Sequence, residues 1–140
     1  MPLTQTATNV FKTGLMTGSY DFSSDTFKIA LYNGNATLNE ETATYTTTNE
    51  ITGSGYSAGG AVLTVSVTPT TGPSGDIAYI SFANVSWSGA LTARGALIYD
   101  VTNGNQTVCV LDFGSDKTST STFTVEFPAA TNTSAIIRLE

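Results

Sequence analysis

Side chains of opposite character alternate with a period of two along most of this chain, and this alternation constrains the fold more than any other feature. In residues 27–32, Phe27, Ile29 and Leu31 share one side, while Lys28, Ala30 and Tyr32 share the other. A period of two is typical of β-strands, whose successive side chains point to opposite faces of a sheet. Further runs span residues 62–67, 77–82, 85–87, 93–99, 106–113, 121–127 and 135–139. The sequence therefore predicts eight or nine strands.

Turn-forming residues separate these runs. They are Asn33-Gly34, Gly72-Pro73-Ser74-Gly75, Asn103-Gly104 and Gly114-Ser115-Asp116. The Asn103-Gly104 pair lies between two apolar runs and is the strongest hairpin signal. Strands at this spacing, in 140 residues without a composition break, predict one domain over residues 1–140. The expected fold is all-β, a jelly-roll-like β-sandwich of about eight antiparallel strands over residues 27–140. The Thr-rich stretch 42–48 is expected to be a strand or an extended edge.

Only the N-terminal segment, residues 1–26, has a helical pattern, and we assign it to one short helix and an arm. Thr8 can cap a helix over residues 9–16, and Gly18 can end it. Eight residues are too few for a stable isolated helix, so it must pack on its own sandwich or on a neighbouring subunit. Its apolar residues form the candidate interface, which is Val10, Phe11, Leu15 and Met16.

The chain has no histidine, and so it lacks the commonest general base and metal ligand. Residues 55–59 match the G-x-S-x-G nucleophile elbow, but a strand pattern follows where the motif needs a helix. A loop calcium site near Asp100, Asp112 and Asp116 is a weaker alternative than solvated turn acids. A small glycan hydrolase that uses a pair of carboxylates stays open as a minor alternative, although nothing in the sequence singles out such a pair. The expectation is no enzymatic activity, no catalytic residue, no cofactor and no metal.

Net charge and hydropathy exclude two classes of partner. The net charge of −6 argues against binding nucleic acid through its phosphates. No apolar run approaches the roughly 20 residues that cross a bilayer, so no membrane partner is expected. The N-terminus has neither the basic nor the apolar region of a signal peptide, which predicts synthesis in the cytoplasm.

Three single residues leave alternatives open. Cys109 lies in a strand pattern and is expected to be a buried, inert thiol. Trp87 and the six tyrosines either pack in a core or interface, which is favoured, or stack on sugars as in lectin-like domains. Arg94 is either an exposed sheet residue or a bridge to a partner carboxylate.

Several segments together resemble a group of small virion proteins of tailed bacteriophages, especially of the podovirus type. The quoted segments are FKIALY at 27–32, ATLN at 36–39, YTTTNEITGSGYSAGG at 45–60, ARGALIY at 93–99, LDFGSDK at 111–117 and AIIRL at 135–139. The resemblance extends from about Val10 to the end of the chain, and residues 49–60 and 94–99 are its most specific parts. Members of this kind act as capsid cement, or decoration, proteins.

The resemblance implies a jelly-roll domain without catalysis that binds the outside of the assembled capsid and bridges major capsid subunits. It also implies contact between copies, as homodimers on the capsid. The location would then be the outer capsid surface of the virion, after synthesis in the host bacterial cytoplasm. A low charged fraction of 11%, with 26 Thr and 14 Ser, suits a surface largely covered by neighbours. The alternative is a head- or tail-fibre domain that binds host-surface glycans through Trp87 and tyrosines.

Overall fold

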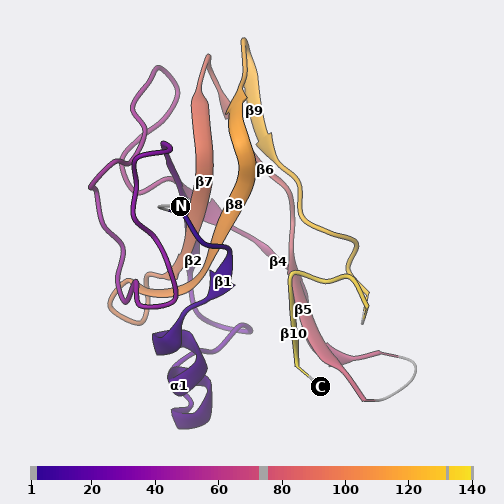
Figure 1. The fold of residues 1–140 in the computed structure, drawn as a ribbon. Coiled ribbons are helices and arrows are strands. Elements are labelled where there is room, and N and C mark those ends of the chain that lie inside the picture. The colour runs from indigo at the N-terminus through magenta and orange to yellow at the C-terminus, as the bar shows by residue number, and fades with distance from the viewer. Residues whose placement is uncertain (1–2, 73–75, 132, 140) are drawn as a thin grey trace.

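The structure is a computed structural model that describes residues 3–72, 76–131 and 133–139. Its elements follow the chain in a simple order (Figure 1). They are β1 (Thr6–Ala7), α1 (Asn9–Thr17), β2 (Phe27–Tyr32), β3 (Ala61–Leu63), β4 (Val65–Thr71), β5 (Ala78–Phe82), β6 (Val85–Ser88), β7 (Thr92–Asp100), β8 (Gln106–Thr118), β9 (Thr122–Val125) and β10 (Ile137–Leu139).

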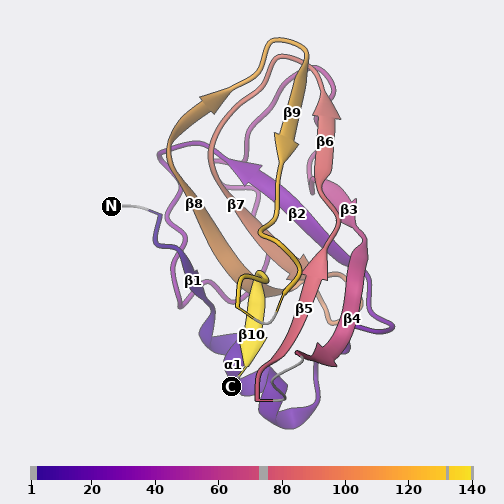
Figure 2. The same ribbon diagram turned by 90° about the vertical axis from the view of Figure 1, so that its right-hand side faces the viewer.

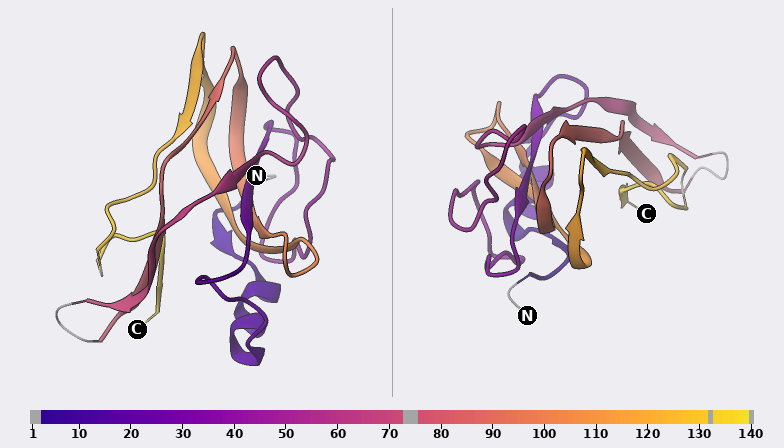
Figure 3. Two further views of the ribbon diagram at one scale, coloured as in Figure 1. Left: turned by 180° about the vertical axis from the view of Figure 1, so that it is seen from behind. Right: turned by 90° about the horizontal axis from the view of Figure 1, so that it is seen from above.

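The strands form two facing layers (Figures 2 and 3). One layer is a five-stranded antiparallel sheet in the order β1-β8-β7-β2-β3. The other contains a three-stranded sheet, β10-β5-β4, and a β6-β9 pair that continues from β5 after two residues. The expected all-β sandwich with one short helix is confirmed. Its ten described strands divide into groups of five, three and two.

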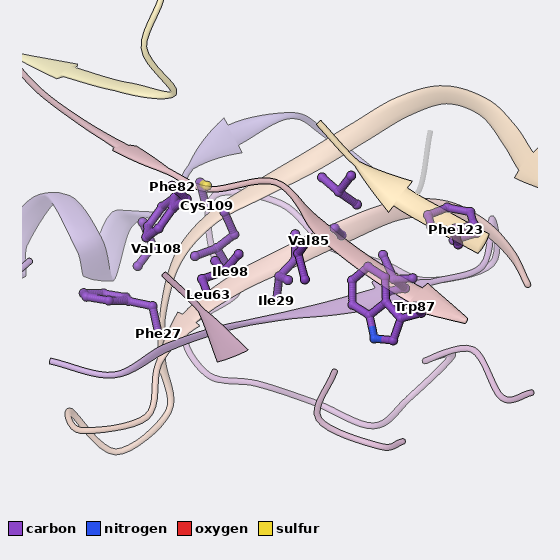
Figure 4. Close-up of a cluster of buried hydrophobic side chains, with 14 of the residues drawn as sticks. Phe27, Ile29, Leu63, Phe82, Val85, Trp87, Ile98, Val108, Cys109 and Phe123 are labelled. Carbon is purple, nitrogen blue, oxygen red and sulfur yellow. The ribbon is translucent and has the colours of Figure 1, made fainter. Parts of the chain in front are cut away.

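The hydrophobic core lies between the two layers (Figure 4). Phe27 and Ile29 of β2 belong to it, together with Phe82, Trp87 and Phe123 of the facing layer. Aromatic rings fill much of the space, and Phe27 and Phe82 have centroids 6.0 Å apart. The period of two that marks β2 in the sequence thus places one set of its side chains in this core.

The other face of the five-stranded sheet is also buried. Tyr32 and Leu97 on this face are covered by Leu38 and other residues of the irregular segment 33–60. Glu50 fixes this segment, because its carboxylate accepts hydrogen bonds from the hydroxyls of Tyr45 and Tyr56, each at 2.6 Å. It also accepts one from the backbone N–H of Gly59 at 2.8 Å. Burial is the main cause that raises the pKa of both tyrosines.

Three parts of the sequence prediction differ from the structure, and a fourth lies mostly outside the described residues. The turn expected at residues 114–116 is wrong, because β8 continues through Gly114, whose φ is 85°, to Thr118. The predicted strand 62–67 is broken at Thr64, where the chain crosses from β3 to β4 in the other layer. The stretch 42–48 is irregular except for a single bridge between Thr44 and Gln106. Of the turn predicted at 72–75, residues 73–75 lie outside the described residues.

The hairpin predicted at Asn103-Gly104 is confirmed. It joins β7 to β8, which pair along most of their length and form the centre of the five-stranded sheet. Gly104 has a φ of 64° and Asn105 a φ of 62°, the left-handed conformation that glycine and asparagine adopt most readily. The local turn chemistry therefore explains where this pairing begins.

Candidate functional site

Helix α1 begins and ends where its caps predict, one residue longer than expected. The side chain of Thr8 accepts a hydrogen bond from the N–H of Phe11, and Gly18 ends the helix at a φ of 75°. Thr8 is fully buried, and its N–H donates a hydrogen bond to the carbonyl of Val108 in β8 at 3.1 Å. The cap therefore fixes the start of the helix to the five-stranded sheet.

The helix packs on its own sandwich, which was one of the two expected alternatives. Phe11 is 3% exposed and meets the ring of Tyr20 edge to face at 5.0 Å. It also contacts Phe22, whose ring centroid lies 6.0 Å away. Gly14 allows this close approach, because a Cβ there would lie 2.3 Å from the ring of Tyr20.

The four residues of the candidate interface divide between core and surface. Phe11 belongs to the core of its own domain. Val10 and Leu15 are half-buried. Met16 is 81% exposed, the largest value among the exposed large hydrophobic residues. The accessible apolar part of α1 is therefore centred on Met16 and the free side of Leu15.

Two apolar hollows lie beside this part of the helix. The first, about 230 Å³, lies between α1 and the second layer and is lined by Leu15, Phe22, Ile80 and Leu139, among others. The second, about 360 Å³, lies between α1, the β1–β8 edge and β10. Leu139 of β10 is 54% exposed. We call this part of the molecule, made of α1, β10 and the two hollows, the α1 end (Figure 1).

The opposite end of the sandwich is lined by hydroxyl groups, and we call it the hydroxyl end. The tips of β7, β8 and β9 meet here (Figure 1). A hollow of about 640 Å³ is lined by residues 117–126 and Phe113. Ser119 holds the tip together, because its hydroxyl donates to the carbonyl of Gly89 at 2.7 Å and accepts from the N–H of Leu91 at 3.1 Å.

A buried carboxyl group lies close to the α1 end. Asp100, the last residue of β7, has no exposed surface, and one of its oxygens accepts a hydrogen bond from the N–H of Asn103 at 3.3 Å. The Asp100 side chain faces Asp25, in the segment that precedes β2. Burial, together with Asp25, raises the pKa of Asp100 to about 7.

The acids considered for a calcium site are not brought together. Asp112 lies on β8, where its carboxylate pairs with Arg94 at 3.2 Å. The pKa of Asp112 is lowered, mainly because its carboxylate accepts a hydrogen bond from the N–H of Gly114. The Arg94 guanidinium lowers this pKa further. Arg94 is thus bridged to a carboxylate of its own chain. Within the described residues, no three His, Cys, Asp or Glu side chains are placed to hold a metal ion.

Other residues singled out in the sequence are structural. Trp87 is 5% exposed and packs between Tyr56 and Phe123, so the favoured packing role is confirmed. Cys109 is buried, and burial raises the pKa of its thiol to about 12. The G-x-S-x-G match at 55–59 lies in a loop before β3.

Comparison with protein-family models, with curated proteins and with solved structures finds no match. Among the described residues, no helix is both long and apolar enough to cross a membrane.

Proposed function

We propose that the protein is a non-enzymatic virion protein of a tailed bacteriophage, a cement or decoration protein that binds the outside of the assembled capsid. In this role it bridges major capsid subunits and stabilises the shell. The sequence segments that resemble such virion proteins are the origin of the proposal. The observation that carries it further is the α1 end, where apolar surface is exposed on a rigid sandwich.

The α1 end has the properties of a contact surface. Met16 and Leu139 are 81% and 54% exposed. Leu139 lines both apolar hollows together with Leu15, the residue that precedes Met16 in α1. Core positions of protein interfaces are depleted in charge and enriched in large apolar residues such as methionine. The preferred partner of this surface is the major capsid protein, with a second copy of the chain beside it as a homodimer.

Repetition on a closed shell makes weak contacts effective. Once one contact of a rigid domain is made, the next one forms at high effective concentration. The sandwich supplies the rigidity, because both faces of its five-stranded sheet are buried. A modest apolar surface at the α1 end is therefore sufficient for a cement protein present in many copies.

The glycan-binding fibre domain is less well supported. Its expected ligand contacts were Trp87 and tyrosines, which need an open ring face to stack on a sugar. Trp87, Tyr32 and Tyr99 are each 5% exposed or less. Trp87 and these two tyrosines are thus used in packing.

The test is to deplete phage heads of this protein and then to add it back. Complete heads are expected to retain their DNA at higher temperature, and under harsher chelation, than depleted heads. Added wild-type protein should bind depleted heads and restore this resistance. Depleted heads as robust as complete ones, or a labelled antibody that marks only the tail, would contradict the proposal.

A further inference from the structure

The corner where the segment before β2 meets the end of β7 contains two carboxyl groups side by side. Asp100 is fully buried, and no donor among the described residues forms a hydrogen bond with its Oδ2 atom. Asp25 is held beside this carboxyl group, because the next residue, Thr26, accepts a hydrogen bond from the N–H of Val101 at 2.8 Å and donates one to the hydroxyl of Thr102 at 2.9 Å. Two ionised carboxylates only accept hydrogen bonds, so they would face each other with like charges and without a donor.

A single proton bound by the pair removes the repulsion and supplies the missing donor. A carboxylic acid donates one hydrogen bond, and the neighbouring carboxylate accepts it. We propose that Asp25 and Asp100 share one proton in the folded protein, and that this proton holds the segment 20–26 against the end of β7. The proton comes from solvent and returns to solvent when the pair ionises, so no other reactant takes part.

Among the described residues, no lysine or arginine acts on Asp100 in place of this proton. On the two strands beside β7, the residues opposite Asp100 are Phe27 and Gln106, and neither titrates. Tyr20, from the segment after α1, is a further titratable group near Asp100. Its pKa is raised to about 12, mainly by burial and also by the negative charge of Asp100. Asp21 adds a further acid, and its N–H donates to Oδ2 of Asp25 at 3.1 Å.

The shared proton ties the pair to the α1 end. Tyr20 and Phe22 belong to the segment that the pair fixes, and both rings pack against Phe11 of α1. Loss of the proton places two negative charges in this corner, which favours separation of the segment from β7. The inference concerns the folded chain alone, so it stands or fails independently of the proposed function.

The sign of the pH dependence follows from proton binding. The folded pKa of Asp100, about 7, lies above the ordinary value of 3.8 that the unfolded chain retains. The folded state therefore holds a proton that the unfolded state has lost, and its stabilising effect disappears as the pH rises through the folded pKa. One such proton makes the unfolding equilibrium constant increase about tenfold per pH unit between about pH 5 and the folded pKa, with no further increase above it.

The experiment is urea unfolding of the full chain from about pH 5 to about pH 8, for wild type and three variants. Asp100→Asn should abolish the one-proton slope and should be more stable than wild type at the alkaline limit. Asp25→Asn should reduce it, because an amide donor then meets Asp100 while the burial of Asp100 remains. Asp116→Asn, the same change at an exposed position, should retain the wild-type slope.

A wild-type slope that persists in both Asp100→Asn and Asp25→Asn would overturn the proposal. If these variants fail to fold, ¹³C carboxyl NMR of the wild type decides the matter. The proposal predicts that the Asp100 carboxyl group titrates near pH 7, and its titration in the ordinary range would overturn the proposal. Stabilisation of the wild type, but not of Asp100→Asn, by added calcium chloride at the alkaline limit would instead identify a cation site and reject the shared proton.

Discussion

The α1 end and the hydroxyl end of the sandwich differ in how their surfaces are used. The hydroxyl end has the larger hollow, about 640 Å³, but its lining is rich in Thr and Ser, and Ser119 bonds within the chain. The α1 end has smaller hollows, about 230 and 360 Å³, lined in part by the exposed Leu139, and its helix carries the exposed Met16. The proposed function therefore places the contact surface at the α1 end, where apolar side chains are exposed, rather than at the larger hollow.

The difference arises from how each end is closed. At the hydroxyl end, residues 119–121 connect β8 to β9, and Thr92 and Thr118 share a hydrogen bond of 3.0 Å across the β7–β8 pair. At the α1 end, the sandwich is covered by a helix of nine residues that buries Phe11 and leaves Met16 outside. The following variants test this contrast, in order of decreasing effect on the free energy of unfolding.

The largest effect is expected where helix α1 packs on the sandwich. Phe11→Ala removes a ring that is 3% exposed and leaves a cavity against Tyr20 and Phe22. Truncation of a buried Phe costs about 3 to 5 kcal/mol of unfolding free energy. Urea unfolding measures the loss, and Met16→Ala on the same helix should change the stability by less than about 0.5 kcal/mol. Equal effects of the two changes would mean that Phe11 does not anchor the helix to the sandwich.

A smaller effect is expected at the hydroxyl end. Ser119→Ala removes the donor to Gly89 and leaves the N–H of Leu91 without its hydroxyl partner. An unsatisfied buried polar group costs about 1 to 3 kcal/mol, and Leu91 itself is 2% exposed. Thermal unfolding should show this loss, while binding of the folded variant to depleted heads should stay at the wild-type level. Loss of binding without loss of stability would move the contact surface to this end.

The smallest effect on stability is expected from charges placed on the two surfaces. Met16→Asp and Thr120→Asp each add one carboxylate, Met16 being 81% exposed and Thr120 also exposed. Each should change the free energy of unfolding by no more than about 0.5 kcal/mol. Sedimentation with depleted heads should separate them, because only Met16→Asp places a charge in the proposed apolar contact. If Thr120→Asp loses binding and Met16→Asp keeps it, the assignment of the two ends is reversed.

Local signals explain which parts of the fold the sequence could predict. The caps at Thr8 and Gly18 and the Asn103-Gly104 turn act over a few residues, and the structure confirms them. The period of two identified β2 and β7, but it does not reveal a crossing such as that at Thr64. The sequence predicts a turn at Gly114, but a glycine with a positive φ also occurs at an irregularity within a strand. Here the pairing of β7 with β8 shifts between Gly95↔Asp112 and Ala93↔Lys117.

The candidate site depended on contacts that are distant in sequence. The apolar residues of α1 were visible in the sequence, but the burial of Phe11 follows from Tyr20 and Phe22, which lie in a segment without a regular pattern. Asp25 and Asp100 are brought together by the antiparallel register of β2 and β7, in which Phe27 lies opposite Asp100. Without that register, Asp100 is one acid among several near turns.

The most direct test of the proposed function is a reconstruction of the intact phage particle in which density for this sandwich is located. The proposal predicts many copies on the outer face of the shell, each with its α1 end, and Met16 in particular, against the major capsid protein or a second copy. Density confined to the tail or a fibre, or copies on the shell whose α1 end faces solvent, would contradict it.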